Sequence, residues 1–140
     1  MDELNGFSVR VYGVCLEEDK VLCLQENFEG KSYCKLPGGG LEFGEGVIEC
    51  LKREFLEELN VQIEIIGHLY TQEDFVESFL KNGKQLLFIY YIVRIINLAD
   101  LNIGDKNITG VTWRRIDGIN PFGLPLDNIA FNKYLEIWKN

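Results

Sequence analysis

The sequence has few of the residues that build thiolate or imidazole metal sites. It contains one histidine, His68, and four cysteines at positions 15, 23, 34 and 50, with no Cys-x-x-Cys pair. Zinc sites favour closely spaced thiol or imidazole pairs, so no zinc site is expected. Cys15 and Cys23 alternate with apolar neighbours, which predicts small buried side chains rather than a disulfide framework.

Long apolar runs and an excess of basic residues are also missing. No run approaches the ~20 apolar residues that span a bilayer, and residues 1–5 are acidic and polar, unlike a signal peptide. We therefore expect a cytoplasmic location and no membrane partner. The formal net charge of -8 argues against a nucleic-acid partner, because binding to the phosphate backbone depends on clustered Lys and Arg.

What is present fits one soluble globular domain over residues 1–140. Hydrophobic residues make up 46% of the chain and charged residues 26%, and this length is enough to bury a core without disulfides. Period-two patterns and β-forming residues predict strands, and apolar stripes at helical spacing predict helices. We expect strands at residues 7–16, 21–25, 32–36, 61–70, 86–96 and 108–116, and helices at 45–59 and 125–139. The fold class is therefore α+β.

A run of three glycines, Gly38 to Gly40, follows Pro37 and is predicted to be an irregular turn. The helix predicted after it carries one apolar stripe, and Asn60 suits the left-handed conformation common just past a helix end. The members of the stripe are Val47, Ile48, Leu51, Phe55 and Leu59. The strand at 86–96 is nearly continuous in β-formers and is expected to be central, with both faces covered.

Three glutamates on the first predicted helix are candidate ligands of a metal ion. Glu54, Glu57 and Glu58 project within an arc of about 100° because residues three and four apart share a helical face. Carboxylates crowded in this way repel one another, and a hard divalent cation such as Mg²⁺ relieves that repulsion. Arg53 lies four residues from both Glu49 and Glu57, so it can hold carboxylates by bidentate hydrogen bonds.

An acid-rich helix face is often only a solvated surface. The spacing of the whole segment decides between a solvated surface and a metal site. It reads Gly39, five residues, Glu45, seven residues, then Arg53-Glu54-Phe55-Leu56-Glu57-Glu58. Six specified residues at background frequencies of roughly one in fifteen coincide by chance about once in ten million starts. The metal and a bound water suit phosphoryl chemistry.

This segment resembles the Nudix box, written G-x5-E-x7-R-E-U-x-E-E-x-G-U, where U is a bulky apolar residue. Val61 matches the last position, and Asn60 stands where the family has its final glycine. The preceding Leu36-Pro37-Gly38-Gly39 resembles the family's entry to the box. The resemblance implies an α/β/α sandwich with a mixed central β-sheet. It also implies a pyrophosphohydrolase that cleaves a phosphoanhydride bond in a nucleoside diphosphate linked to another group, such as a nucleotide sugar, an ADP-ribose-like compound or a nucleoside triphosphate.

The resemblance also implies roles for particular residues. Glu54, Glu57 and Glu58 would hold Mg²⁺ or Mn²⁺, with the Gly38 carbonyl as a further ligand. Arg53 would orient the glutamates, and Gly39 and Glu45 would support the site. The base that deprotonates water is Glu54 or Glu57 in some members and a loop acid in others, and here the loop at 101–109 offers Asp105.

Several alternatives stay open from the sequence. For Lys35 the alternatives are contact with a substrate phosphate and an ordinary solvated position on a strand. Tyr33, Tyr70 and Phe75 would stack on a base or pack in the protein. The expected partner is a small nucleotide, and a homodimer is one option for the assembly. A Nudix-like module that binds a nucleotide metabolite without turnover is the alternative function.

Overall fold

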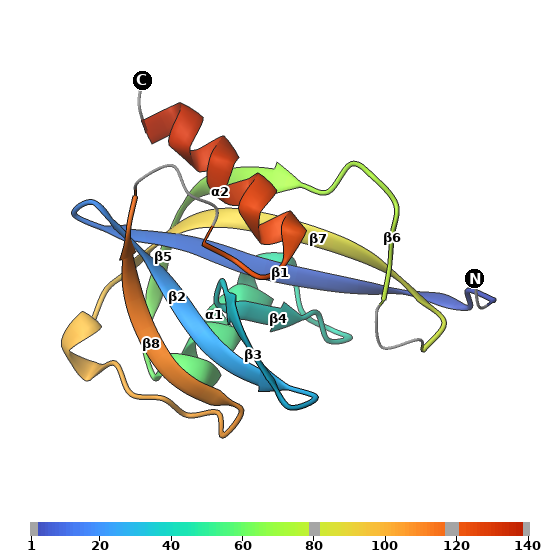
Figure 1. Ribbon diagram of the computed structural model, residues 1–140, viewed down its shortest axis with the longest axis horizontal. Helices are drawn as coiled ribbons and strands as arrows, with labels where there is room; N and C mark the ends of the chain where they lie inside the picture. The colour runs from blue at the N-terminus through green and yellow to red at the C-terminus, as the bar shows by residue number, and fades with distance from the viewer. Residues whose placement is uncertain (1–2, 79–81, 117–120, 139–140) are drawn as a thin grey trace.

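A mixed β-sheet lies between two helices in the computed structural model, which describes residues 3–78, 82–116 and 121–138 (Figure 1). The strands are β1 (Gly6–Glu17), β2 (Lys20–Phe28), β3 (Lys31–Lys35), β4 (Gly38–Gly40), β5 (Ile63–Thr71), β6 (Val76–Glu77), β7 (Lys84–Ile95) and β8 (Ile108–Arg115). The helices are α1 (Val47–Leu59), α2 (Pro125–Trp138) and the 3-10 helix η1 (Leu98–Asp100). The arrangement confirms the predicted α/β/α sandwich.

The strand order β3-β2-β1-β7-β5 places β7 inside the sheet between β1 and β5, and its residues enter both core clusters, as its apolar sequence predicted. β1 runs parallel to β7 from Gly6↔Lys84 to Cys15↔Val93, and β5 is antiparallel to β7. β1 and β2 pair only next to their turn, and β2 then pairs with β3 and β8. In Figure 1 these three strands run off at an angle to β1 and β7.

Alternation along β1 divides the core between the two helices. Val11 and Cys15 face the cluster that contains Phe55 of α1, whereas Tyr12 and Val14 face the cluster that contains α2 residues. Cys15 and Cys23 are fully buried, which confirms that prediction. The part of the chain that the structure describes has no helix both long and apolar enough to cross a bilayer.

The first helix begins two residues later than predicted. Gly46 is its N-cap, and the Gly46 N–H donates to Glu49 Oε1 at 3.2 Å. Glu45 therefore lies outside the helix and is free to meet other groups. Placing Ile48 in the buried stripe was wrong, because its side chain is 41% exposed and Cys50 is buried instead. The helix ends as predicted at Asn60, whose φ of 57° is left-handed.

The prediction of an irregular glycine turn was wrong. Gly38–Gly40 forms β4, which pairs antiparallel with β1 through Val11↔Gly39. The close approach explains the glycines. A Cβ on Gly38 would lie 2.1 Å from the Val11 carbonyl oxygen, and its φ of +146° disfavours other residues. A strand here holds the glycines against the middle of the sheet, directly beside α1.

Smaller differences come from tertiary packing. β2 continues to Phe28, beyond the strand predicted at residues 21–25, because β3 pairs with it up to Phe28↔Lys31. On α2, which was predicted to bury Ala130, Tyr134 and Leu135 together with Ile129, the first three do pack in the core, whereas Ile129 is 40% exposed and Phe131 is buried. Residue 139 of the predicted second helix lies outside the described residues.

A buried carboxylate ties α2 to the segment that precedes β4. Asp127 is 0% exposed and accepts hydrogen bonds from the Tyr90 hydroxyl at 2.6 Å and the Leu36 N–H at 3.0 Å. These bonds satisfy a polar group that would otherwise be costly to bury. Burial nevertheless raises the pKa of Asp127 from 3.8 to about 6.

This pKa predicts a pH dependence of stability. Between the two pKa values the folded chain binds more protons than the unfolded chain, so the contribution of Asp127 falls as pH rises from about 4 to about 6. The loss approaches about 3 kcal/mol. Chemical denaturation of wild type and Asp127→Asn across this window isolates the effect, because the variant carries no charge there. A difference in unfolding free energy that stays constant with pH would contradict this assignment.

Candidate active site

Arg53 is the centre of the site and joins three segments. Its Nε and Nη2 donate to the two Glu45 carboxylate oxygens at 3.0 and 2.7 Å. Nη2 also donates to the Gly40 carbonyl at 3.0 Å. The bonds from Arg53 and from the Glu42 N–H hold the pKa of Glu45 down to about 2. The fork of one guanidinium therefore fixes α1, the loop before it and β4 relative to one another.

The other end of the same guanidinium holds two of the helix glutamates. Arg53 Nη1 donates to Glu54 Oε1 at 3.0 Å and to Glu57 Oε2 at 3.2 Å. Glu42 lies 3.7 Å from the same nitrogen. Glu49, the other glutamate at helical spacing from Arg53, caps the helix instead. Arg53 thus brings Glu54 and Glu57 together.

Glu54 lies against Gly39. A Cβ on Gly39 would lie 2.5 Å from the Glu54 carboxyl carbon, so this carboxylate occupies the space that a side chain would fill. Burial raises the pKa of Glu54, and the negative charge of Glu57 raises it further. The crowding predicted from the helix spacing is therefore real, and it is the condition that a bound cation relieves.

Glu58 occupies a different environment from its neighbours. It is 4% exposed, its Oε1 accepts the Gly38 N–H at 3.0 Å, and its Oε2 lies 3.6 Å from Lys35 Nζ. Burial raises the pKa of Glu58 to about 7. Glu57 is its opposite, with a side chain 58% exposed. The structure thus places Glu58 beneath the surface at β4 and Glu57 at the surface.

The donor set fits a hard divalent cation. Within residues 3–78, 82–116 and 121–138, no three His, Cys, Asp or Glu side chains already surround one point as a metal cage. Mg²⁺ does not need such a cage, because it is usually held by one or two carboxylates together with water and substrate phosphates. Glu54 and Glu57, both on Arg53, supply oxygen donors of that kind.

Lys35 is not the solvated strand lysine that the sequence left open. It is 7% exposed, its Nζ lies 3.0 Å from Glu26 Oε2, and the ammonium faces the Tyr12 ring at 5.9 Å. The nearby Glu58 charge is the main influence that raises the pKa of Lys35 against the opposing effect of burial. Lys35 is a buried cation between the helix and a cavity.

Asp105 lies next to the C-terminal end of α1. Asn102 N–H and Gly104 N–H donate to the carbonyls of Leu59 and Glu58 at 2.9 and 2.8 Å, which seats this loop on the helix end. The Asp105 carboxylate accepts the Asn107 N–H at 2.9 Å within its own turn. The structure therefore brings the loop to the helix and engages one oxygen of Asp105 locally.

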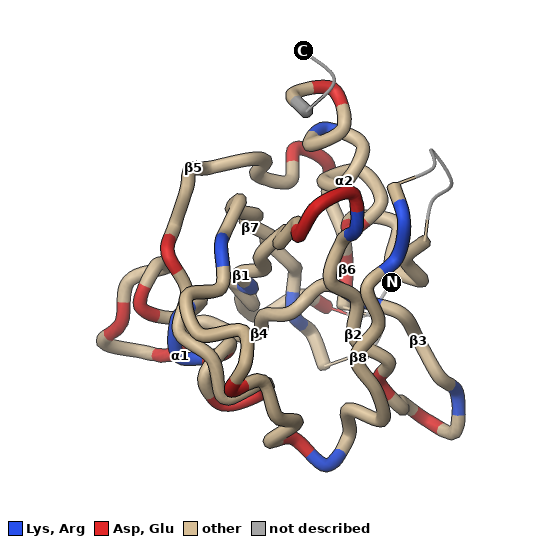
Figure 2. Tube along the Cα trace, turned by 90° about the vertical axis from the view of Figure 1, so that its left-hand side faces the viewer, with Lys and Arg blue, Asp and Glu red and all other residues tan. Residues whose placement is uncertain are grey.

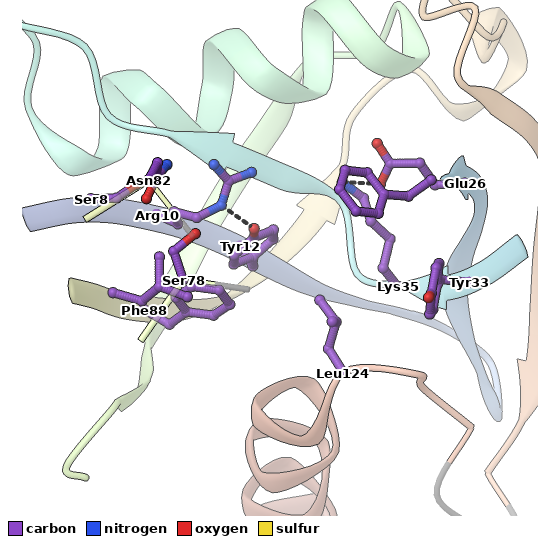
Figure 3. Close-up of a pocket in the computed structure, with 12 residues that line it drawn as sticks. Ser8, Arg10, Tyr12, Glu26, Tyr33, Lys35, Ser78, Asn82, Phe88 and Leu124 are labelled. Atoms are coloured by element: carbon purple, nitrogen blue, oxygen red, sulfur yellow. Dashed lines mark hydrogen bonds and ion pairs between the residues drawn. The ribbon is translucent and has the colours of Figure 1, made fainter. Parts of the chain in front are cut away.

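A cavity of about 540 Å³ opens on the α2 side of β1 (Figure 3). Its lining residues are Ser8, Arg10, Tyr12, Glu26, Phe28, Tyr33, Lys35, Ser78, Asn82, Leu86, Phe88 and Leu124. Of the aromatic candidates, Tyr33 lines the cavity, Tyr70 is buried in the core and Phe75 is 53% exposed away from it. Arg10, Tyr12 and Glu26 gave no sequence signal, since each occupies an ordinary strand position whose neighbours only the folded sheet decides.

Comparison with known proteins agrees with this geometry. A family model described as NUDIX domain matches residues 5–134. A NUDIX hydrolase from Nitrosomonas europaea has a TM-score of 0.79 at 24% identity, over 93% of this chain and 89% of that one. A C. elegans Ap4A hydrolase has a TM-score of 0.73 at 18% identity, over 94% and 96%. An ADP-ribose pyrophosphatase from Streptococcus suis has a TM-score of 0.70 at 17% identity, over 95% and 92%.

A glutamate-bearing helix that follows a glycine strand, within an α/β/α sandwich, defines the Nudix class of pyrophosphohydrolases, which generally use a divalent metal. The chain belongs to the Nudix hydrolase family. Asn60 is the one departure from the box. Its φ of 57° is the left-handed conformation that the usual glycine would adopt at this position.

Proposed function

We propose that this enzyme hydrolyses a phosphoanhydride bond in a nucleoside diphosphate linked to another group, with Mg²⁺ or Mn²⁺ held by Glu54, Glu57 and Glu58. The observation that supports the proposal is the arrangement around Arg53. One guanidinium orders Glu54 and Glu57 on the same side, next to β4. The Gly38 carbonyl is a further candidate ligand.

A divalent cation at this position would neutralise phosphate charge and lower the pKa of a bound water molecule. Arg53 keeps the carboxylates oriented, and Glu45 keeps Arg53 in place through two hydrogen bonds. Water attacks one phosphorus, the bond from that phosphorus to the bridging oxygen breaks, and the bridging oxygen leaves on the other phosphate. The products are two phosphate-bearing molecules, or pyrophosphate and a monophosphate from a triphosphate.

Three residues are candidates for the base that takes the proton from water. Glu54 and Glu57 form the carboxylate pair that Arg53 holds, and both lie beside the proposed cation. Asp105, on the loop seated at the end of α1, is the third candidate. A comparison of Glu54→Gln, Glu57→Gln and Asp105→Asn pH–rate profiles separates them, because loss of the base removes the acidic limb.

A small nucleotide is the proposed partner. The cavity volume of about 540 Å³ lies in the range of small-molecule sites. For the described residues, Figure 2 shows the Lys and Arg positions spread over separate parts of the trace, rather than gathered as a nucleic-acid surface requires. Lys35 lines the cavity and is a candidate phosphate contact. A cytoplasmic location and action as one domain belong to the same proposal.

A substrate panel tests the function. Purified protein with Mg²⁺ or Mn²⁺ is incubated with ADP-ribose, nucleotide sugars, nucleoside triphosphates, dinucleoside polyphosphates and coenzyme A, and products are identified by mass spectrometry. We expect monophosphate or pyrophosphate release from at least one class, and its loss with EDTA. A panel without any product would count against hydrolysis. Calorimetric binding without turnover would favour the non-catalytic module.

A further inference from the structure

Arg10 presents its positive charge in the cavity, on the face of β1 opposite α1. Its Nε donates to the Tyr12 hydroxyl at 2.6 Å, and its guanidinium lies 5.7 Å from the centre of the Tyr12 ring. Residues two apart on a strand share a face, so Tyr12 supports the arginine from the same side of the sheet. Figure 3 shows the pair between Ser8 and Asn82 on one side and Lys35 and Tyr33 on the other.

The two cations of the cavity differ in how they are neutralised. Lys35 lies within 4 Å of the Glu26 and Glu58 carboxylates. Arg10 makes no ion pair with any carboxylate of the described residues, and Glu54 and Glu26 act on it only from a greater distance. Arginine stays charged at all accessible pH values, and a partly buried charge without a counter-ion is costly. The cavity therefore offers one cation that a bound anion can neutralise.

Arg10 also lies next to the reacting end of the site. It is opposite Gly40 in the pairing of β1 with β4, and a Cβ on Gly40 would lie 3.5 Å from Arg10 Nη1. The carbonyl of the same glycine accepts a hydrogen bond from Arg53. Arg10 and Arg53 thus meet one residue of β4. The charge of Glu54, which Arg53 holds, acts on Arg10 from the other face of β4, so an anion on Arg10 would lie within electrostatic range of that carboxylate.

We propose that Arg10 binds the diphosphate group of an organic diphosphate whose organic part lies against Tyr33 and Phe28 in the cavity. This inference rests on the proposed function and assigns the substrate contact that selects a diphosphate. The guanidinium fork suits two phosphate oxygens. Tyr12 keeps the fork turned into the cavity. Aromatic side chains at the lining suit a planar base.

Binding of uncleavable diphosphates tests the role of Arg10. The probes are the α,β-methylene diphosphates of adenosine, guanosine, cytidine and uridine, each compared with its nucleoside by calorimetry in Mg²⁺. We expect wild type to bind at least one diphosphate more tightly than its nucleoside. Arg10→Gln is expected to weaken the diphosphate by about 10- to 100-fold and to leave the nucleoside unchanged.

Three further variants make the result specific. Arg10→Lys keeps the charge but loses the fork, so an intermediate affinity is expected, and Tyr12→Phe is expected to weaken the diphosphate alone. Arg94→Gln is the matched control, because Arg94 pairs with Glu64 and does not line the cavity. Melting temperatures show that each variant is folded.

Two outcomes would overturn the inference. One is a wild type that binds none of the diphosphates better than its nucleoside. The other is an unchanged preference for diphosphate in folded Arg10→Gln and Arg10→Lys, which would mean that Arg10 acts only on its protein neighbours. Because binding is measured without turnover, this proposal and the proposed hydrolysis fail separately.

Discussion

Replacing Glu57 with glutamine is expected to lower kcat by about 10²- to 10⁴-fold while leaving the fold intact. The reason is that Glu57 belongs to the carboxylate pair on Arg53 but contributes little to packing. Its side chain is 58% exposed and its contact with Arg53 is one hydrogen bond of 3.2 Å. An exposed ion pair of this kind stabilises a protein by only about 0–1 kcal/mol. Steady-state kinetics and thermal unfolding of the same preparation separate the two effects.

Glu49→Gln is the matched control for this experiment. It removes one negative charge from the same helix, and glutamine can keep the capping contact with the Gly46 N–H. We expect kcat and melting temperature close to those of wild type. If Glu57→Gln turned over substrate at the wild-type rate, Glu57 would have no part in catalysis, and the metal and base roles would pass to Glu54, Glu58 or Asp105.

The second large effect is expected from alanine at two adjacent glycines. One substitution should lower activity and the other should lower stability. In Gly39→Ala the new Cβ would lie 2.5 Å from the Glu54 carboxyl carbon, which is the end of a flexible side chain and can move. The fold should survive. The displaced Glu54 should lower kcat by about 10²-fold or more, since small misplacements of catalytic groups have effects of this size.

In Gly38→Ala the new Cβ would meet backbone instead, 2.1 Å from the Val11 carbonyl oxygen, at a φ of +146°. Neither β1 nor β4 can move without breaking their pairing. We expect a loss of about 3 kcal/mol or more in the free energy of unfolding, from the overpacking and the strained backbone together. Chemical denaturation monitored by circular dichroism measures this loss.

Gly40→Ala completes the series as a control. Its Cβ would lie 3.5 Å from Arg10 Nη1, an ordinary contact, so a change of no more than about 1 kcal/mol is expected. A stable Gly38→Ala, or a fully active Gly39→Ala, would show that β4 does not approach β1 and α1 as closely as these distances require.

Helix α1 is the part of the candidate site that could be predicted best from the sequence, because its geometry is local. A period of 3.6 residues fixes Glu54, Glu57 and Glu58 on one face without reference to the rest of the chain. The same locality predicted the left-handed end at Asn60. The apolar run of β7 predicted a central strand with both faces covered, which its place between β1 and β5 and its residues in both core clusters confirm.

Only the tertiary structure determined which groups surround the side chains of that helix. β4 was expected to be irregular because strand pairing with β1 depends on residues far away in the sequence. The burial of Glu58 beside Lys35, and the placing of Arg10 in a cavity with Tyr12, follow from the register of the sheet. Spacing along the chain determines which side chains share a face of one element. Which faces meet, and therefore which charges are paired or left to a ligand, is determined by long-range packing of the whole sandwich.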